Sequence, residues 1–324
     1  MSLQELVPSV LGQYGFTADA TYTLLTDQWN TTYHITLSNG QQYNLRICGQ
    51  AFQNDKLLED ELNFVDFVAR SKKVRVPTPV RNKQGTFVTF LDTGAHTRLC
   101  CLFEWIKGTP ARGQLTIPLI YEMGKMTAHL HGVIQTFQFP EANDTFRPGY
   151  NFDEVLVASH REWITAYAGD IGADHVTLLD KAVDYAFAHL SALPKTRTTY
   201  GFIHADLHPG NFIVTEDIVA IIDFDQLGRG HFCFDFAVMM VELFDEGENC
   251  AALWSGFKDG YQAVAPLPFE DDEDDSALNP FVIAVHLGFL DWIYNTPSPQ
   301  VREQWMPKLP VTYQSIQSRT DMHG

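Results

Sequence analysis

The chain has 324 residues, of which 45% are hydrophobic and 13% aromatic, a composition that excludes a disordered protein and allows a large core or two lobes. Its 22 Lys and Arg against 40 Asp and Glu give a formal charge of −18, which argues against nucleic acid or an anionic membrane as a partner and is compatible with a cationic substrate. We see no signal-peptide pattern and no apolar stretch of the ~18 residues that a membrane span needs. The five cysteines form no CxxC pair, so we expect free thiols in a cytoplasmic protein.

The first hundred residues predict a β-rich part with one helix. Strand-like runs occupy residues 21–27, 31–38, 41–48, 85–92 and 97–106. Asn39-Gly40 between two of these runs is a strong signal for a β-hairpin. Apolar residues at Leu58, Leu62, Val65 and Val68 predict a helix over residues 57–71.

Beyond the break at residues 107–110 the pattern becomes helical. Helical periodicity covers residues 118–134, 151–168, 178–193, 234–244, 253–264 and 280–294. We therefore predict an α+β protein with a small antiparallel part at residues 1–107 and a larger helical part at residues 108–324. The linker between them falls at about residues 103–108.

Residues 201–225, GFIHADLHPGNFIVTEDIVAIIDFD, interrupt the helices with a predicted strand pair rich in polar side chains. A turn centred on Asp217 places Asn211 opposite Asp223, and Pro209-Gly210 can turn Asp206 toward the same place. Amide and carboxylate oxygens suit Mg²⁺, and Asp206 could accept the proton of an attacking hydroxyl. The alternative is that these three residues only satisfy backbone donors at turns and strand ends.

Glu61 is a second unusual residue because its spacing from Leu58 and Val65 places a carboxylate on the apolar face of its helix. A carboxylate that faces a core needs a partner. Arg46, in the strand NLRIC, is the obvious one. The pair could serve a binding site or only the structure.

HADLHPGN resembles the catalytic HxDxxxxN loop of the aminoglycoside phosphotransferase, choline kinase and homoserine kinase superfamily, and IIDFD resembles its metal-binding motif. The similarity extends over nearly the whole chain and is nearer the homoserine-kinase and stress-response-kinase branch. It implies a bilobal protein-kinase-like fold that uses ATP and Mg²⁺. It also implies that Asp206 is catalytic, that Asn211 and Asp223 bind the metal, and that His204 is a structural residue of the loop.

The resemblance implies a nucleotide site in the β-rich part. Arg46, where many relatives have Lys, would grip the α- and β-phosphates and Glu61 would hold it in place. The usual Gly-rich loop is absent, and Asn30, Thr31 and Thr32 are the alternative phosphate donors, although the same residues make an ordinary turn. LFEWIKG resembles the hinge, in which backbone groups near Glu104 and Ile106 would pair with the base; a core strand leading into a linker is the alternative reading.

Further residues are assigned more than one role. Asp225 could assist the metal or be a solvated strand end, His208 could approach the substrate or stabilise its loop, and Asp235 reads as a helix N-cap, where the family has an aspartate that braces the catalytic loop. The candidates for an acceptor pocket are Tyr150, Asn151, His286, Asp291 and Trp292, although plain helix packing is the favoured interpretation for each residue taken singly. The implied activity is transfer of the γ-phosphate of ATP to a small-molecule hydroxyl, with a cationic acceptor as one option. A protein Ser/Thr kinase and a nucleotide-binding pseudokinase are the alternatives, and the oligomeric state is open.

Overall fold

The computed structural model describes residues 3–16, 19–27, 29–49, 54–94, 96–137, 150–215, 219–270, 275–296 and 298–321. The chain divides into two compact units. The first comprises Met1–Pro110 with Phe212–Asp225, and the second comprises Ala111–Asn211 with Gln226–Gly324. The strand pair within residues 201–225 therefore groups with the first unit, although the loop that precedes it groups with the second.

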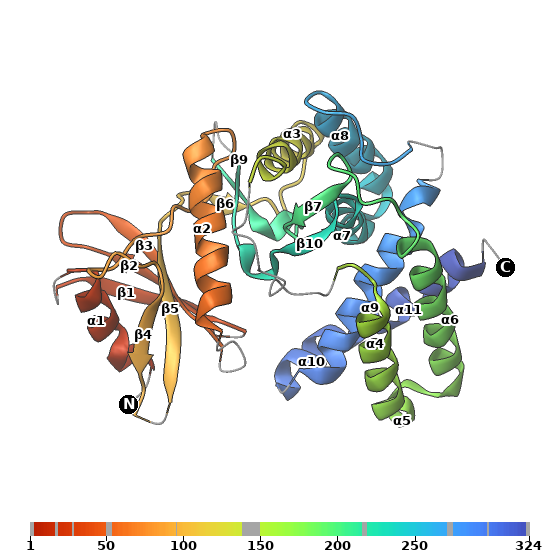
Figure 1. Ribbon diagram of the computed structural model, residues 1–324, viewed down its shortest axis with the longest axis horizontal. Coiled ribbons are helices and arrows are strands. Elements are labelled where there is room, and N and C mark those ends of the chain that lie inside the picture. Colours follow the sequence, from red (N-terminus) through yellow and green to blue (C-terminus); the bar gives the residue numbers. More distant parts are fainter. Residues whose placement is uncertain are drawn as a thin grey trace. The chain divides into compact units, whose positions relative to one another are not determined.

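The first unit contains a five-stranded antiparallel sheet in the order β1-β2-β3-β5-β4 (Figure 1). Its strands are β1 (Thr21–Asp27), β2 (Thr31–Thr36), β3 (Gln42–Ile47), β4 (Thr89–Asp92) and β5 (Thr97–Glu104). Thr36 pairs with Gln42 across the predicted Asn39-Gly40 turn, in which Gly40 adopts a φ of 84°. The strands and the hairpin that the sequence predicted are confirmed.

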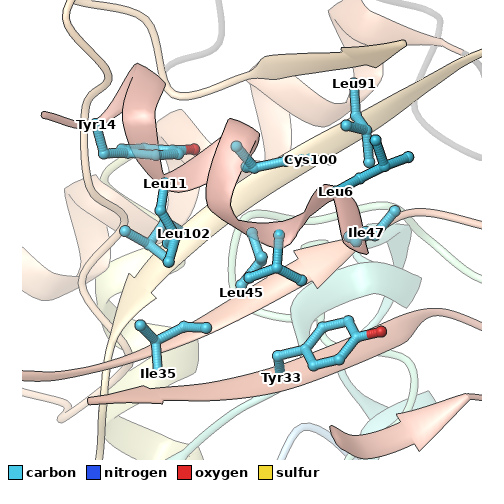
Figure 2. Packing of buried hydrophobic residues seen from close by; sticks show 12 residues of the cluster. Leu6, Leu11, Tyr14, Tyr33, Ile35, Leu45, Ile47, Leu91, Cys100 and Leu102 are labelled. Atoms are coloured by element: carbon cyan, nitrogen blue, oxygen red, sulfur yellow. The ribbon is translucent and has the colours of Figure 1, made fainter. Parts of the chain in front are cut away.

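One face of this sheet packs against α1 (Leu3–Gln13), a helix that the sequence analysis missed. Strand residues two positions apart, such as Tyr33 and Ile35 or Leu45 and Ile47, join this apolar cluster with Leu6 and Leu11 of the helix (Figure 2). Because side chains alternate along a strand, the intervening residues lie on the opposite face.

The opposite face packs against α2 (Asp55–Ser71), in a cluster that includes Leu58, Leu62, Cys101 and Phe103. The helix begins where the Asn54 side chain accepts a hydrogen bond from the Leu57 N–H, and it ends at Lys72 in the left-handed conformation. The predicted apolar stripe is buried in the structure. Arg46 of β3 and Glu61 of α2 are buried between this face and the helix.

Three short strands complete the first unit as a separate sheet in the order β6-β8-β9, formed by β6 (Thr109–Pro110), β8 (Phe212–Val214) and β9 (Val219–Ile221). Phe212 pairs with Ile221 and Val214 with Val219. This register matches position 211 with position 222, so the predicted pairing of Asn211 with Asp223 is wrong by one residue. The turn residues Glu216 and Asp217 lie outside the described residues.

The second unit is mainly helical, with one antiparallel strand pair formed by β7 (Tyr200–Ile203) and β10 (Gly228–His231). Its longer helices are α3 (Ile117–Ile134), α4 (Glu154–Ala166), α6 (Ala173–Leu190), α7 (Cys233–Leu243), α8 (Cys250–Gln262), α9 (Asn279–Asn295) and α11 (Leu309–Asp321), and the shorter ones are α5 (Ala168–Ile171) and α10 (Pro299–Trp305). All six predicted helical segments are confirmed, while α10 and α11 were not predicted.

Helices α3 and α8 pack with their backbones in close approach. A Cβ atom added at Gly260 would lie 1.9 Å from the carbonyl oxygen of Tyr121, and one added at Gly124 would lie 2.1 Å from that of Phe257. Only glycine fits at these positions, so the two helices are held at a fixed separation.

The segment Ser276–Asn295 is long and apolar enough to cross a membrane by those criteria alone, contrary to the expectation from the sequence. However, 61% of it is buried inside the protein, and α9 contacts α4, α6, α7 and α11. It therefore has the surroundings of a core helix. All five cysteines are free thiols, as expected, and all except Cys250 are buried.

Candidate active site

A buried ion pair joins the sheet to α2 in the first unit. Nη2 of Arg46 lies 2.6 Å from Oε1 of Glu61, and the two side chains are 7% and 6% exposed. The partner that the sequence predicted for Glu61 is confirmed. Because Arg46 remains charged at any physiological pH, removal of Glu61 would leave a buried, uncompensated guanidinium.

The same face of the sheet carries polar atoms that have no hydrogen-bond partner among the described residues. They are Nε of Arg46, Nε2 of His34 and Oδ1 of Asn44, all buried. His34 and Asn44 are direct cross-strand neighbours, and Asn44 precedes Arg46 by two residues on the same face. Unsatisfied buried polar atoms are costly, so this face is suited to a polar ligand such as a nucleotide.

The β1–β2 connection is tied to the IIDFD motif. Nδ2 of Asn30 donates to Oδ2 of Asp225 (3.1 Å), and the Gly49 N–H donates to Oδ1 of Asn30 (3.2 Å). The Thr31 hydroxyl donates to Asp27 (2.6 Å), whereas Thr32 pairs with Arg46 in the sheet. The side chains of Asn30 and Thr31 therefore stabilise the connection. Phosphate binding by the backbone N–H groups of these residues stays a prediction.

Asp223 adopts a left-handed conformation with a φ of 65°, which is unusual for a residue with a side chain. Loss of hydration, followed by the negative charge of Asp225, raises its pKa above the usual range of an aspartate. Its side chain is partly accessible to water at the surface, which moderates this effect of lost hydration. The negative charge of Asp225 makes ionisation of Asp223 unfavourable, and a divalent cation would offset this repulsion. Carboxylate oxygens are also suitable ligands for such a cation.

The hinge segment follows β5. The Glu104 N–H donates to the Thr78 carbonyl and the Trp105 N–H to that of Gln42, whereas the Ile106 N–H has no hydrogen bond within the described part of the chain. The Trp105 ring lies over His34, with 4.2 Å between the ring centroids. Of the two predicted hinge residues, Glu104 already uses its backbone N–H within the protein, so Ile106 is the one whose N–H could donate to a ligand.

The loop His204–Asn211 belongs to the second unit. Ala205 has a φ of 64°, and the Asp206 N–H donates to Nδ1 of His204 (3.3 Å). Nδ2 of Asn211 donates to the backbone oxygen of Asp206 (2.8 Å) and to its carboxylate Oδ2 (2.9 Å). These bonds orient the Asp206 carboxylate. They involve only Nδ2 of Asn211, so the amide oxygen Oδ1 is a candidate metal ligand.

His208 is neutral and stabilises this loop. Burial, followed by the positive charge of Arg112, lowers its pKa to about 3. Its Nδ1 accepts from the Gly210 N–H (2.9 Å) and lies 3.3 Å from Nη2 of Arg112, so Nε2 carries the ring proton. Nε2 lies 3.6 Å from Oδ2 of Asp206, too far for a hydrogen bond.

Asp235 braces the loop. Its carboxylate accepts from the N–H groups of His204 (3.1 Å) and Ala205 (2.7 Å) and from Nε2 of His131 (3.0 Å). Its interpretation as an N-cap is wrong, because α7 begins at Cys233 and no side chain caps it. The bracing role that the resemblance implied agrees with this geometry, but His131 was missed because one histidine in an apolar helix carries no distinctive signal.

The acceptor candidates have separate partners. Tyr150 donates to Gln226 and Asn151 accepts from Tyr200, whereas His286 bonds with Ser315. Asp291 accepts from Asn295, and Trp292 lies against Phe289 and Trp305. The five side chains do not form one pocket through these contacts. No group of three or more His, Cys, Asp or Glu suited to a metal occurs within the described ranges.

The chain matches the family model "Phosphotransferase enzyme family" over residues 21–267, and it belongs to this family. Amicoumacin kinase of Bacillus subtilis is 24% identical over 242 residues, which cover 74% of this chain and 68% of that protein. A protein of Synechocystis is 27% identical over 238 residues, 73% of this chain and 63% of the relative, so the match spans less than two thirds of that protein.

Solved structures show the same fold. Amicoumacin kinase hAmiN, in complex with AMP-PNP, Ca²⁺ and Ami, superposes with a TM-score of 0.81 at 20% identity, covering 99% of this chain and 94% of that one. A microcompartment-associated aminopropanol kinase gives 0.77 at 24% identity, covering 98% and 95%. The predicted family and fold class are thereby confirmed: the protein has a phosphotransferase fold with an antiparallel sheet of five strands and a mainly helical second unit.

Proposed function

We propose that the protein is a kinase that transfers the γ-phosphoryl group of ATP to the hydroxyl of a small amino alcohol, with Mg²⁺ as the metal. The observation that carries the proposal is the pair of hydrogen bonds by which Asn211 orients Asp206 in a loop of the HxDxxxxN pattern. A fixed carboxylate beside an amide oxygen suits a reaction that removes a proton from a hydroxyl next to a metal–phosphate complex.

Asp206 is the proposed base. It orients the acceptor hydroxyl and takes its proton as the oxygen attacks the γ-phosphorus, while the bond from that phosphorus to the leaving ADP oxygen breaks. Its Oδ2 accepts from Nδ2 of Asn211, a hydrogen bond that fixes the orientation of the carboxylate. His208, neutral and bonded through Nδ1, holds the loop and leaves the proton transfer to Asp206.

Arg46 is the proposed phosphate ligand, held by Glu61 and with Nε unsatisfied. The chemistry of the oxygen donors fits Mg²⁺ at Asn211 and Asp223. When bound there, the ion would neutralise charge on the phosphate oxygens. Asp225, tied to Asn30, is proposed to support Asp223 and the β1–β2 connection.

The amino alcohol is proposed from two observations. The net charge of −18 favours a cationic small molecule, and a structurally similar protein is described as an aminopropanol kinase.

We also propose a cytoplasmic location for the protein, which the free thiols support.

The test is incubation of the protein with ATP, Mg²⁺ and a panel of amino alcohols, hydroxy amino acids and aminoglycosides, followed by detection of phosphorylated product by mass spectrometry. We expect one class of hydroxyl acceptor to be phosphorylated, with turnover lost in EDTA and restored by Mg²⁺. Tight binding of ATP with no transfer to any acceptor would instead support a nucleotide-binding module.

A further inference from the structure

A buried triad extends from the catalytic loop into the helical core of the second unit. It consists of Tyr261 on α8, His131 on α3 and Asp235 on α7, which are 3%, 1% and 0% exposed. Nδ1 of His131 lies 3.0 Å from the Tyr261 hydroxyl, and Nε2 lies 3.0 Å from Oδ2 of Asp235. These two hydrogen bonds satisfy both ring nitrogens of His131.

The direction of the hydrogen bonds follows from the chemistry of the groups. A carboxylate only accepts, so Nε2 of His131 must carry the proton that it donates to Asp235. In a neutral imidazole Nδ1 is then an acceptor, and the Tyr261 hydroxyl donates to it. Burial raises the pKa of Tyr261 well above its ordinary value, which keeps this hydroxyl protonated.

The packing around the triad holds the imidazole in one orientation. Phe232 stacks on the His131 ring with 4.4 Å between centroids and 17° between planes. Tyr261 adjoins Gly260, whose close approach to Tyr121 fixes the separation of α8 from α3. The stacked Phe232 ring and the close packing of the two helices therefore restrict rotation of the imidazole.

The other end of the triad controls the loop. Oδ1 of Asp235 accepts from the Ala205 N–H, and Oδ2 accepts from both His204 and His131. The two backbone N–H groups directly precede the Cα atom of Ala205. The left-handed conformation of this residue costs energy for a residue with a side chain and directs the chain into Asp206. A rotation of the Asp235 carboxylate would release this turn.

We propose that His131 and Tyr261 are positioning residues: together they fix the orientation of Asp235 and, through it, the conformation of the loop that presents Asp206. This inference rests on the proposed function, because Asp206 is the base of that reaction. The triad has no contact with nucleotide or acceptor in the proposal, so it acts on the chemical step and not on substrate binding.

The experiment compares His131→Phe and Tyr261→Phe with the matched control Tyr294→Phe. Tyr294 is also 3% exposed, and its hydroxyl bonds to that of Tyr313, outside the triad. We expect kcat to fall about 10-fold in Tyr261→Phe and roughly 10- to 100-fold in His131→Phe, because each leaves a buried polar group of the triad with one partner fewer. KM for ATP and acceptor should stay unchanged, and Tyr294→Phe should retain the kcat of the wild type.

Hydrogen exchange measured by mass spectrometry gives a readout that does not require catalysis. Peptides that cover residues 200–211 should exchange faster in His131→Phe and Tyr261→Phe than in Tyr294→Phe, and His131→Gln, which keeps a donor, should lie closer to the wild type than His131→Phe. A wild type without transferase activity would count against the proposed function, while the exchange rates would still decide on the triad. If His131→Phe fails to fold, Tyr261→Phe, which removes one oxygen atom, decides. The proposal is overturned if the triad variants match Tyr294→Phe in loop exchange and in kcat.

Discussion

Arg46 on β3 and Glu61 on α2 form an ion pair with less than a tenth of either side chain exposed. Such a pair is costly to break, because the remaining charge has neither water nor a partner. We expect Glu61→Ala to lower the free energy of unfolding by roughly 3–5 kcal/mol. Urea unfolding measures this loss.

The control for Glu61 lies on the same helix. Asp66 pairs with Arg70 and lies 3.9 Å from Arg81, and these arginine side chains are 70% and 45% exposed. Asp66→Ala should therefore lower stability by no more than about 0.5 kcal/mol. Equal losses in the two variants would show that the buried pair is not the source of the effect.

The second prediction concerns the shape of the Arg46 guanidinium. Lysine keeps the charge but not the fork of donors, so Arg46→Lys should weaken ATP binding about 10-fold. Isothermal titration calorimetry measures the dissociation constant. Arg98, a buried arginine of β5 that donates to the Cys48 carbonyl, supplies the control: Arg98→Lys should bind ATP as the wild type does. Identical ATP affinity in both variants would remove Arg46 from the site.

Much of the site was predictable from the sequence because its signals are local. Glu61 interrupts an apolar helical stripe, and the motif between His204 and Asn211 has a fixed spacing within one loop. The five-stranded sheet followed from alternation and from the Asn39-Gly40 turn.

The features of the site and fold that the sequence did not predict depend on tertiary structure. His131 and Tyr261 occur in ordinary apolar helices, and only the packing of α3, α7 and α8 brings them to Asp235. The register of β8 and β9 depends on a turn whose type the residues do not determine, and an error of one residue shifted the predicted partner of Asn211. No helix was predicted over α1, which contains Pro8, a residue that disfavours a helix interior, and which buries Leu6, Val7, Val10 and Leu11.

The third prediction tests the contact between α3 and α8. Gly260→Ala places a methyl group against the Tyr121 backbone, which cannot move without separating the helices, so we expect a loss of at least about 2 kcal/mol in unfolding free energy. At Gly132, on the same α3 helix, a Cβ meets nothing within 4 Å. Gly132→Ala should therefore be neutral or stabilise the protein by up to about 1 kcal/mol. Thermal unfolding of both variants checks the contrast, and a similar Tm would contradict the close approach.

The fourth prediction concerns pH. His160 is buried and its Nδ1 accepts from Nε1 of Trp163, and burial lowers its pKa from 6.5 to about 4. The folded state therefore binds fewer protons than the unfolded state between these values. The stabilising contribution of neutral His160 is complete above pH 6.5 and declines as the pH falls toward 4, by about 3 kcal/mol in all.

His160→Gln provides the comparison, since glutamine can accept the Trp163 bond without titrating. Its free energy of unfolding should fall less steeply than that of the wild type between pH 6.5 and pH 4.5. Parallel pH dependence of the two proteins would show that His160 does not titrate as the structure implies.

The central claim is that Asp206 accepts the proton of the attacking hydroxyl, and single-turnover transfer of phosphate from ATP to the acceptor found in the panel tests it most directly. Asparagine keeps the shape of the side chain and the Asn211 contact but cannot take the proton. We expect Asp206→Asn to slow the transfer step by ~10²–10⁴ while the affinity for ATP stays that of the wild type. Transfer at the wild-type rate in Asp206→Asn would contradict the account.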